Sequence, residues 1–293
     1  MSLAFRTVGI LAKPSDDRLA GTLETLVTHL RERGLDILLD QATLPDLASL
    51  RDYPRATRDE IGQQSDLVIS VGGDGTLINA AHCLAPHGKP VLGINLGRLG
   101  FLVDISPDEL NSRLDRILAG EYIAEERFLL CGRVLRGEDV VHEGIVFNDL
   151  VYKVRDAVRM IEFETHIDGR YLFTQRSDGM VICTPSGSTA YALSAGGPIL
   201  TPDLESIVLA PICPHTLSNR PIVVPASSTV EIKATPHSRA NSLVSFDGQT
   251  MIDMEPEDRL NICRAAHSAR LIHPADYDYF HILRAKLHWG GHP

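Results

Sequence analysis

The sequence predicts an α/β N-terminal domain with a mostly parallel sheet, followed by an all-β, sandwich-like C-terminal domain. Residues 1–122 alternate short apolar runs with amphipathic stretches at helical spacing, which is typical of a parallel sheet covered by helices. Residues 123–270 contain many short strand-like runs with turn signals between them, which is typical of a β-sandwich. The chain of 293 residues is long enough for two such domains.

The elements of the first domain follow from hydrophobic spacing. Phe5–Leu11 and Ile37–Leu39 predict two strands, and a helix between them ends at Gly34. That helix is indicated by one apolar stripe, made of Leu19, Leu23, Leu26, Val27 and Leu30. Leu67–Val71 and Val91–Ile94 are nearly all apolar, so each predicts a strand buried on both faces.

Two more helices are expected in this domain. The first follows Leu67–Val71 and is indicated by the spacing of Leu77, Ile78, Ala80, Ala81 and Leu84. The second begins at Ser106-Pro107-Asp108-Glu109, where a cap, a proline at the first position and a capping-box Glu coincide, and it ends at Gly120.

The second domain is predicted from its strands and turns. The strand-like runs are Leu129–Leu135, Glu143–Phe147, Met160–Ile167, Met180–Cys183, Ile207–Ala210, Ile222–Val224, Thr229–Ala234 and Leu260–Cys263. Arg136-Gly137, Asp168-Gly169 and Asp247-Gly248 indicate tight hairpin turns. A short helix is expected near Ser188.

Composition and charge exclude several classes of function. The formal net charge of −10 argues against a nucleic-acid partner and against an anionic membrane surface. No apolar stretch is long enough to cross a bilayer, and Met1–Ala12 lacks the features of a signal peptide, so we expect a cytoplasmic protein. The five cysteines form no Cys-x-x-Cys pair and predict buried free thiols. The twelve histidines form no zinc motif.

The strongest candidate site follows the strand Leu67–Val71. Gly72-Gly73-Asp74-Gly75-Thr76 is a glycine turn between a buried strand and a helix, an arrangement in which backbone N–H groups converge on an anion. A carboxylate repels phosphate, so Asp74 is expected to hold a metal or accept a proton. The alternative is an ordinary tight turn, since Gly and Asp suit turns. The run is neither a Walker A loop nor a dinucleotide fingerprint.

Three more segments carry polar groups that could bind a ligand. Asn148-Asp149 can read hydroxyl groups, or can simply end a strand. Arg176-Ser177-Asp178-Gly179 offers a phosphate clamp or a surface ion pair. Thr184–Gly197 crowds small residues and hydroxyls into a turn before a short helix, so its donors can face a ligand. A serine hydrolase is improbable there, because the chain has no Gly-x-Ser-x-Gly elbow.

Together these motifs resemble the NAD kinase family. The matching segments are Gly72-Gly73-Asp74-Gly75-Thr76, Asn95 with Gly97, Leu99-Gly100-Phe101, Asn148-Asp149, Ser177-Asp178-Gly179, Thr184-Pro185-Ser186-Gly187-Ser188-Thr189-Ala190-Tyr191, Asp247-Gly248-Gln249 and Leu283–Trp289. The glycine motif alone also occurs in phosphofructokinases and lipid kinases, whereas the run to Tyr191 is much more specific. Many members have Asn-Glu where this chain has Asn148-Asp149, and Thr where it has Ser186; both changes keep the functional group.

The resemblance implies phosphorylation of the 2′-hydroxyl of the adenosine ribose of NAD by ATP with a divalent metal, Mg²⁺ being expected. It also implies a homo-oligomer, a dimer or a tetramer, and a tail, residues 271–293, that returns to the first domain. By analogy Asp74 is the base, and no metal ligand is assigned. The positions that match NAD contacts are Asp74, Gly75, Asn148, Asp149, Arg159, Arg176, Asp178, Thr189, Ala190, Tyr191, Ala192, Leu193, Ser194 and Gln249. The positions expected to cradle the donor phosphates are Gly72, Gly73, Gly75 and Thr76.

Two alternatives to an NAD kinase stay open at this point. A lipid kinase of the diacylglycerol or sphingosine type shares the glycine motif, but it should show a membrane-seeking surface, and the chain has no basic amphipathic helix. A non-catalytic regulator would keep the NAD pocket without turnover.

Overall fold

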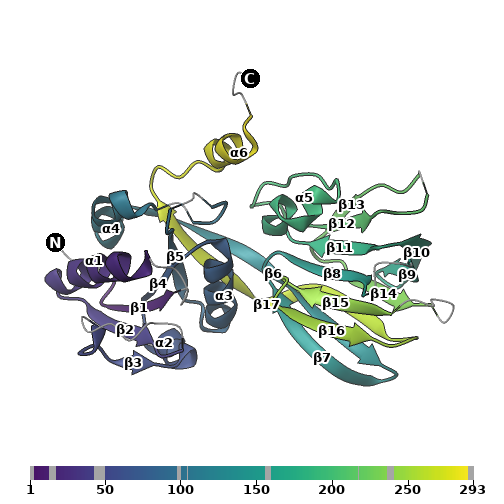
Figure 1. Ribbon diagram of the computed structural model, residues 1–293, viewed down its shortest axis with the longest axis horizontal. Coiled ribbons are helices and arrows are strands. Elements are labelled where there is room, and N and C mark those ends of the chain that lie inside the picture. The colour runs from purple at the N-terminus through teal and green to yellow at the C-terminus, as the bar shows by residue number, and fades with distance from the viewer. Residues whose placement is uncertain are drawn as a thin grey trace. The chain divides into compact units, whose positions relative to one another are not determined.

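The contacts of the chain divide it into two compact units (Figure 1). The computed structural model describes residues 3–12, 18–42, 50–97, 100–103, 105–155, 160–216, 218–235 and 241–289. Unit 1 comprises Met1–Glu126 and Ser268–Pro293, and unit 2 comprises Arg127–His267. Unit 1 is an α/β domain with a mostly parallel sheet and unit 2 is a β-sandwich, so the predicted fold class is confirmed.

The sheet of unit 1 has the strand order β17-β5-β4-β1-β2-β3, and its pairs are parallel. Its strands are β1 (Thr7–Ala12), β2 (Asp36–Asp40), β3 (Arg55–Ala56), β4 (Leu67–Val71), β5 (Pro90–Ile94) and the end of β17 (Arg259–Pro274). Its helices are α1 (Leu19–Glu32), α2 (Arg58–Gln64), α3 (Asp74–Leu84), α4 (Leu110–Leu118) and α6 (Tyr279–Leu287), with 3₁₀ turns at Ala85–His87 and Pro107–Glu109.

Helices cover both faces of this sheet. Ile10 of β1 packs in one core cluster with Leu23 of α1 and Leu114 of α4. A Cβ on the neighbouring Gly9 would lie 2.4 Å from Ile61 of α2. Because successive residues of a strand face opposite sides, α1 and α2 lie on opposite faces. This two-sided cover explains why all five residues of β4 are buried.

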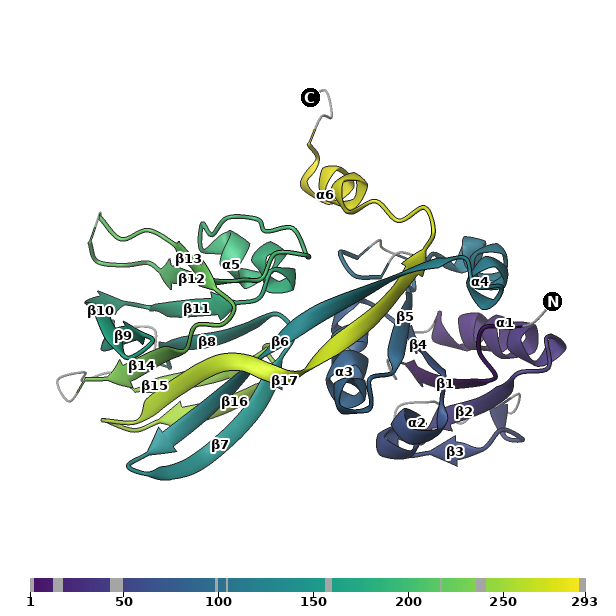
Figure 2. The same cartoon turned by 180° about the vertical axis from the view of Figure 1, so that it is seen from behind.

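Unit 2 contains two groups of antiparallel strands. One sheet has the order β13-β12-β11-β8-β15-β16, and the other group is β10-β9-β14-β17 with β6 and β7. The strands are β6 (Tyr122–Arg136), β7 (Asp139–Val146), β8 (Asp149–Val154), β9 (Ile161–Ile167), β10 (Arg170–Ser177), β11 (Gly179–Cys183), β12 (Ser206–Ile212), β13 (Ile222–Pro225), β14 (Val230–Ala234), β15 (Ser242–Phe246) and β16 (Thr250–Met254). Figure 2 shows β6 and β17 as long paired strands, and both contribute residues to each unit.

The core of unit 2 contains side chains from both of its groups of strands. The ring of Tyr152 on β8 meets that of Phe163 on β9 edge to face, with centroids 5.1 Å apart, and both side chains are buried. The turns predicted at Asp168-Gly169 and Asp247-Gly248 are confirmed, because Asp168 and Asp247 adopt φ of 52° and 48°, the left-handed conformation that such turns require. The turn predicted at Arg136-Gly137 lies one residue later, because Arg136 is the last residue of β6 and Asp139 the first of β7.

Several local predictions were wrong. Ser106 makes no side-chain cap bond, and Pro107–Glu109 is a 3₁₀ turn, so the predicted capping box is absent there. The real capping box joins Thr57 and Glu60 at the start of α2, a helix that the sequence did not indicate. By contrast, the expected turn and short helix near Ser188 are present, as a 3₁₀ turn (Ser186–Thr189) followed by a four-residue helix, α5 (Tyr191–Ser194).

Strands β8, β10, β15 and β16 were also not predicted. The five cysteines are free, but only Cys131 and Cys183 are buried, whereas Cys213 is exposed.

Candidate functional site

The turn after β4 leaves backbone N–H groups open at the start of α3. The helix begins at Asp74, so the N–H groups of its first residues have no acceptor within the helix, although that of Thr76 donates to the Gly73 carbonyl at 2.9 Å. A Cβ on Gly73 or Gly75 would meet no heavy atom within 4 Å, whereas one on Gly72 would lie 2.3 Å from the Thr76 hydroxyl oxygen. The turn therefore requires glycine at position 72, because any larger residue would clash with the Thr76 side chain. Gly73 and Gly75 instead leave a surface on which an anion can approach the main chain.

The carboxylate of Asp74 is fixed by the next loop of unit 1. It accepts hydrogen bonds from the backbone N–H groups of Phe101 at 2.8 Å, Leu102 at 3.1 Å and Val103 at 3.2 Å. Gly100 allows this approach, because a Cβ there would lie 1.9 Å from Asp74 Oδ1. A carboxylate has about four lone-pair sites, so three such bonds leave room for one more proton donor.

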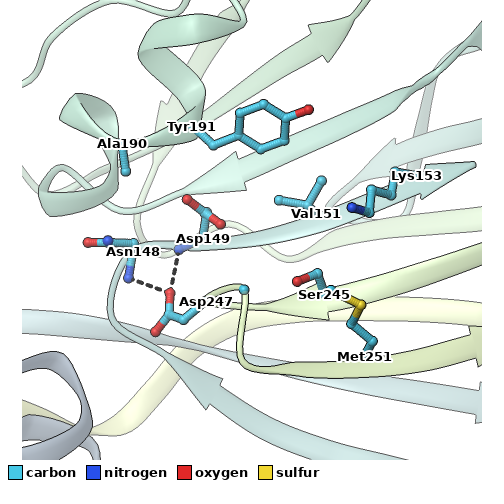
Figure 3. Close-up of a pocket in the computed structure, with 10 residues that line it drawn as sticks. Asn148, Asp149, Val151, Lys153, Ala190, Tyr191, Ser245, Asp247 and Met251 are labelled. Atoms are coloured by element: carbon cyan, nitrogen blue, oxygen red, sulfur yellow. Dashed lines mark hydrogen bonds between the residues drawn. The ribbon is translucent and has the colours of Figure 1, made fainter. Parts of the chain in front are cut away.

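Unit 2 contains a pocket of about 290 Å³ (Figure 3). It is lined by Asn148, Asp149, Val151, Lys153, Ala190, Tyr191, Ser245, Asp247, Gly248 and Met251. Asn148 and Asp149 stand at the start of β8, and the main-chain N–H groups of both donate to the carboxylate of Asp247. The pocket thus collects polar groups from β8, from the turn between β15 and β16, and from the start of α5.

The side chains of Asn148 and Asp149 are poised to bind hydroxyl groups. Asn148 Oδ1 is buried and accepts no hydrogen bond from the part of the chain that the structure describes. The residue Asp149 is only 6% exposed. Burial and, second, the charge of Asp247 raise the pKa of its carboxyl to about 7. A ligand that donates hydrogen bonds to these atoms would satisfy both groups.

Three hydroxyls of the Thr184–Gly197 segment donate to main-chain carbonyls. Thr184 Oγ1 donates to the Phe147 carbonyl at 2.6 Å, and Ser188 Oγ donates to the Pro185 carbonyl at 2.6 Å. Thr189 Oγ1 donates to the Ser186 carbonyl at 3.2 Å. A Cβ on Gly187 would lie 2.2 Å from the Asn148 carbonyl oxygen. The segment therefore packs directly against the backbone of Asn148.

Only part of the predicted set lines this pocket. Ala190 and Tyr191 do, whereas Ala192 is buried in a core cluster with Val151 and Cys183. Leu193 and Ser194 belong to α5 but are not among the lining residues. Gln249 follows the Asp247-Gly248 turn, and Arg159 lies outside the described residues.

Arg176 and Asp178 stand apart from the pocket. The Arg176 side chain is 65% exposed and lies 3.9 Å from Glu162. Asp178 precedes β11, whose far end, Cys183, pairs with Asp149. Five residues of strand separate the two acids by about 16 Å, at about 3.3 Å per residue.

Lys153, Ser245, Asp247 and Met251 line the pocket but were not predicted as site residues. Only Asp247 had a local signal, as a turn residue. The others belong to strands β8, β15 and β16, which the sequence did not reveal. Among the described residues, no group of three His, Cys, Asp or Glu could hold a metal, and no helix is long and apolar enough to span a membrane.

Comparisons with known proteins agree on one family. The model of the ATP-NAD kinase N-terminal domain matches residues 8–122, and that of the C-terminal domain matches residues 147–274. NAD kinases of Nitrosococcus oceani and Methylococcus capsulatus are 47% and 48% identical over 290 and 293 residues, covering 99% of each chain.

Two solved structures share the fold. The yeast NADH kinase complexed with NADH gives a TM-score of 0.87 at 24% identity, covering 98% of this chain and 89% of that one. An NAD kinase from Archaeoglobus fulgidus in complex with ATP gives a TM-score of 0.75 at 25% identity, covering 97% of this chain and 100% of that one.

Proposed function

Because the chain belongs to the NAD kinase family, we propose that it is an ATP-dependent NAD kinase that phosphorylates the 2′-hydroxyl of the adenosine ribose of NAD. The observation that carries this proposal is a carboxylate fixed beside an open, anion-binding turn. Phosphoryl transfer asks mainly for positioning and charge neutralisation, and this turn offers both.

Each group at the turn has a role in the reaction. The open N–H groups at Gly73 and Gly75, with Gly72 and Thr76 shaping the turn, bind the phosphates of ATP. Asp74 accepts the proton of the attacking hydroxyl while the ribose oxygen bonds to the terminal phosphorus. The bond from that phosphorus to the bridging oxygen then breaks, and ADP leaves with the electron pair.

A divalent metal fits the donor side of this site. Magnesium is commonly held by one or two carboxylates together with substrate phosphates, so the lack of a three-ligand cluster among the described residues does not conflict with it. When bound, the metal would neutralise phosphate charge. Asp74 is the nearest carboxylate to the turn that could contribute to holding it.

The acceptor NAD is bound by the groups predicted from the family motifs. Asn148 and Asp149 receive ribose hydroxyls through an unsatisfied amide oxygen and a buried carboxyl. The remaining proposed contacts are Asp74, Gly75, Arg159, Arg176, Asp178, Thr189, Ala190, Tyr191, Ala192, Leu193, Ser194 and Gln249. We also propose a homo-oligomer, a dimer or a tetramer.

The ionisable and hydrogen-bonding side chains of the pocket favour NAD over a lipid acceptor. Six of its lining residues carry polar groups: Asn148, Asp149, Lys153, Tyr191, Ser245 and Asp247. The test is ADP release from Mg²⁺–ATP by the purified chain with NAD, with diacylglycerol vesicles, or with neither. We expect stimulation by NAD alone. Stimulation by the lipid alone would indicate a lipid kinase, and NAD binding without ADP release would indicate a regulator.

Gly75→Ala is expected to separate stability from activity. Gly75 lies in the first turn of α3, and the added Cβ meets nothing within 4 Å. Alanine should therefore stabilise the helix by about 0.5–1 kcal/mol. The methyl group also occupies the surface on which the phosphates approach, so the KM for ATP should rise.

Gly21→Ala is the matched control for this change. Gly21 lies in the first turn of α1, and its added Cβ is equally free of contacts. Denaturant unfolding should show a similar gain in the free energy of unfolding for both variants. Steady-state kinetics should show an unchanged KM for ATP only in Gly21→Ala. An unchanged KM in Gly75→Ala would remove the turn from the donor site.

A further inference from the structure

Asp247 is tied to the chain segment that carries Asn148 and Asp149. Its carboxylate accepts from the N–H groups of Phe147 at 2.7 Å, Asn148 at 2.8 Å and Asp149 at 2.9 Å. Its own N–H donates to the Asp149 carbonyl at 3.0 Å. Four hydrogen bonds thus join one turn residue to three consecutive residues about a hundred positions earlier.

Asp247 accepts hydrogen bonds from all three main-chain N–H groups of the segment from Phe147 to Asp149. This segment joins the end of β7, Val146, to the start of β8. On its other side the Thr184 N–H donates to the Asn148 carbonyl at 2.9 Å, and Gly187 packs against that carbonyl. The carbonyl side is therefore held by the Thr184–Gly197 segment, and the N–H side is held by Asp247.

We propose that Asp247 is a positioning residue for the acceptor: by fixing the main chain of Phe147–Asp149 it directs the side chains of Asn148 and Asp149 into the pocket. The proposal rests on the proposed function, because the acceptor is taken to be NAD. Asp247 adopts φ of 48°, which an Asn tolerates as well as an Asp, so its turn can be kept while its carboxylate is removed.

The charge of Asp247 gives this role a pH signature. Four titratable groups surround Asp149. They are Asp247 in the β15–β16 turn, Lys153 on the same strand as Asp149, Tyr191 on α5 and Cys183 on β11. Burial and the charge of Asp247 together raise the pKa of Asp149 to about 7. Because ionised Asp149 is the better acceptor for hydroxyl groups, NAD affinity should fall as the pH drops below about 7. Without the charge of Asp247, this fall should begin at a lower pH.

The test is Asp247→Asn, with NAD binding measured by calorimetry and turnover measured with Mg²⁺–ATP. The amide oxygen of Asn can accept from the N–H groups of Asn148 and Asp149, but the amide NH₂ group then faces the N–H of Phe147, and that hydrogen bond is lost. We expect NAD affinity to fall about 10-fold or more, with a smaller change in kcat, and the pH midpoint of NAD binding to move down.

Asp168→Asn is the matched control. Asp168 occupies the same kind of turn at φ of 52°, and its carboxylate accepts from the Thr229 N–H at 2.8 Å. It is not among the residues that line the pocket. Its replacement should lower stability less than that of Asp247, whose carboxylate accepts three such bonds, and should leave both the NAD affinity and the pH midpoint unchanged.

A second variant, Asp247→Glu, separates geometry from charge. It keeps the charge but displaces the carboxylate, so NAD affinity should fall while the pH midpoint stays near that of the wild type. NAD affinity within twofold of wild type in either folded variant would overturn the proposal, and so would loss of the fold in both. Wild type that binds NAD but makes no NADP would overturn the proposed function alone.

Discussion

Asp74→Asn is expected to lower turnover by about 10²–10⁴-fold, the usual loss when a general base is removed. The amide has no basic oxygen that can take the hydroxyl proton. It also disturbs the local structure, since the NH₂ group faces one of the three N–H groups that the carboxylate now accepts, those of Phe101, Leu102 and Val103. The measurement is kcat with saturating NAD and Mg²⁺–ATP.

The control for that disturbance is Asp66→Asn. Asp66 Oδ2 accepts from the N–H groups of Arg6 at 2.9 Å and Thr7 at 3.1 Å, and these bonds lower its pKa. Because both donate to the same oxygen, the amide oxygen of Asn can still accept them, so this replacement removes the charge that the two bonds stabilise within the same unit. We expect both variants to lose stability and only Asp74→Asn to lose turnover. Turnover of Asp74→Asn within a few-fold of wild type would remove Asp74 from catalysis.

Binding of Mg²⁺–ATP distinguishes the two possible jobs of Asp74. If Asp74 is a base, its replacement by Asn only removes a negative charge near the phosphates, so the affinity for Mg²⁺–ATP should be unchanged or tighter. As a metal ligand, its replacement should weaken that affinity and raise the Mg²⁺ requirement. The three N–H bonds fix the carboxylate and leave about one free lone pair, which either job would use, so the binding measurement decides between them.

Asp149→Asn is expected to stabilise the protein and to impair NAD binding. The raised pKa means that the unfolded chain ionises Asp149 near pH 4, whereas the folded protein ionises it near pH 7. The cost of burying the charge therefore grows between pH 4 and pH 7 and is constant above. A pKa raised from 3.8 to about 7 corresponds to about 4 kcal/mol, an upper bound on the gain.

Denaturant unfolding at pH 5.5 and pH 8 checks this prediction. The gain of Asp149→Asn over wild type should be larger at pH 8. Asp203→Asn is the control of opposite sign, because a hydrogen bond from Thr201 lowers the pKa of Asp203, so its replacement should bring no gain at pH 8. NAD affinity of Asp149→Asn should fall about 10- to 100-fold, the loss expected for a hydrogen bond to a charged group. An equal gain in the free energy of unfolding at both pH values would contradict the claim that Asp149 is buried as a charged group at pH 8.

The local pattern of the sequence was sufficient for the elements nearest the donor turn. Strand β4 has the predicted bounds, because five consecutive buried residues leave little ambiguity, and the glycine turn after it marks the start of α3. The expected turns at Asp168 and Asp247 also formed, since their left-handed conformation depends on the residues themselves. Strands β8, β15 and β16 were missed, because their pairing partners decide their conformation.

The contacts that fix the site side chains are long-range and left no local signal. Asp74 binds residues 27 to 29 positions later, and Asp247 binds residues 98 to 100 positions earlier. The hydroxyl-rich run at Thr184 predicted ligand contacts, and three of its hydroxyls, those of Thr184, Ser188 and Thr189, donate to main-chain carbonyls. Composition alone could not distinguish these two uses of a serine or threonine.

Identification of the product formed from NAD and Mg²⁺–ATP tests the central claim most directly. The purified chain is incubated with both nucleotides, and the product is offered to a dehydrogenase that accepts only NADP, with phosphorus NMR locating the new phosphate. The account predicts NADP carrying the phosphate on the 2′-oxygen of the adenosine ribose, formed in proportion to ADP. The absence of a phosphorylated product, or a phosphate at another position of NAD, would contradict it.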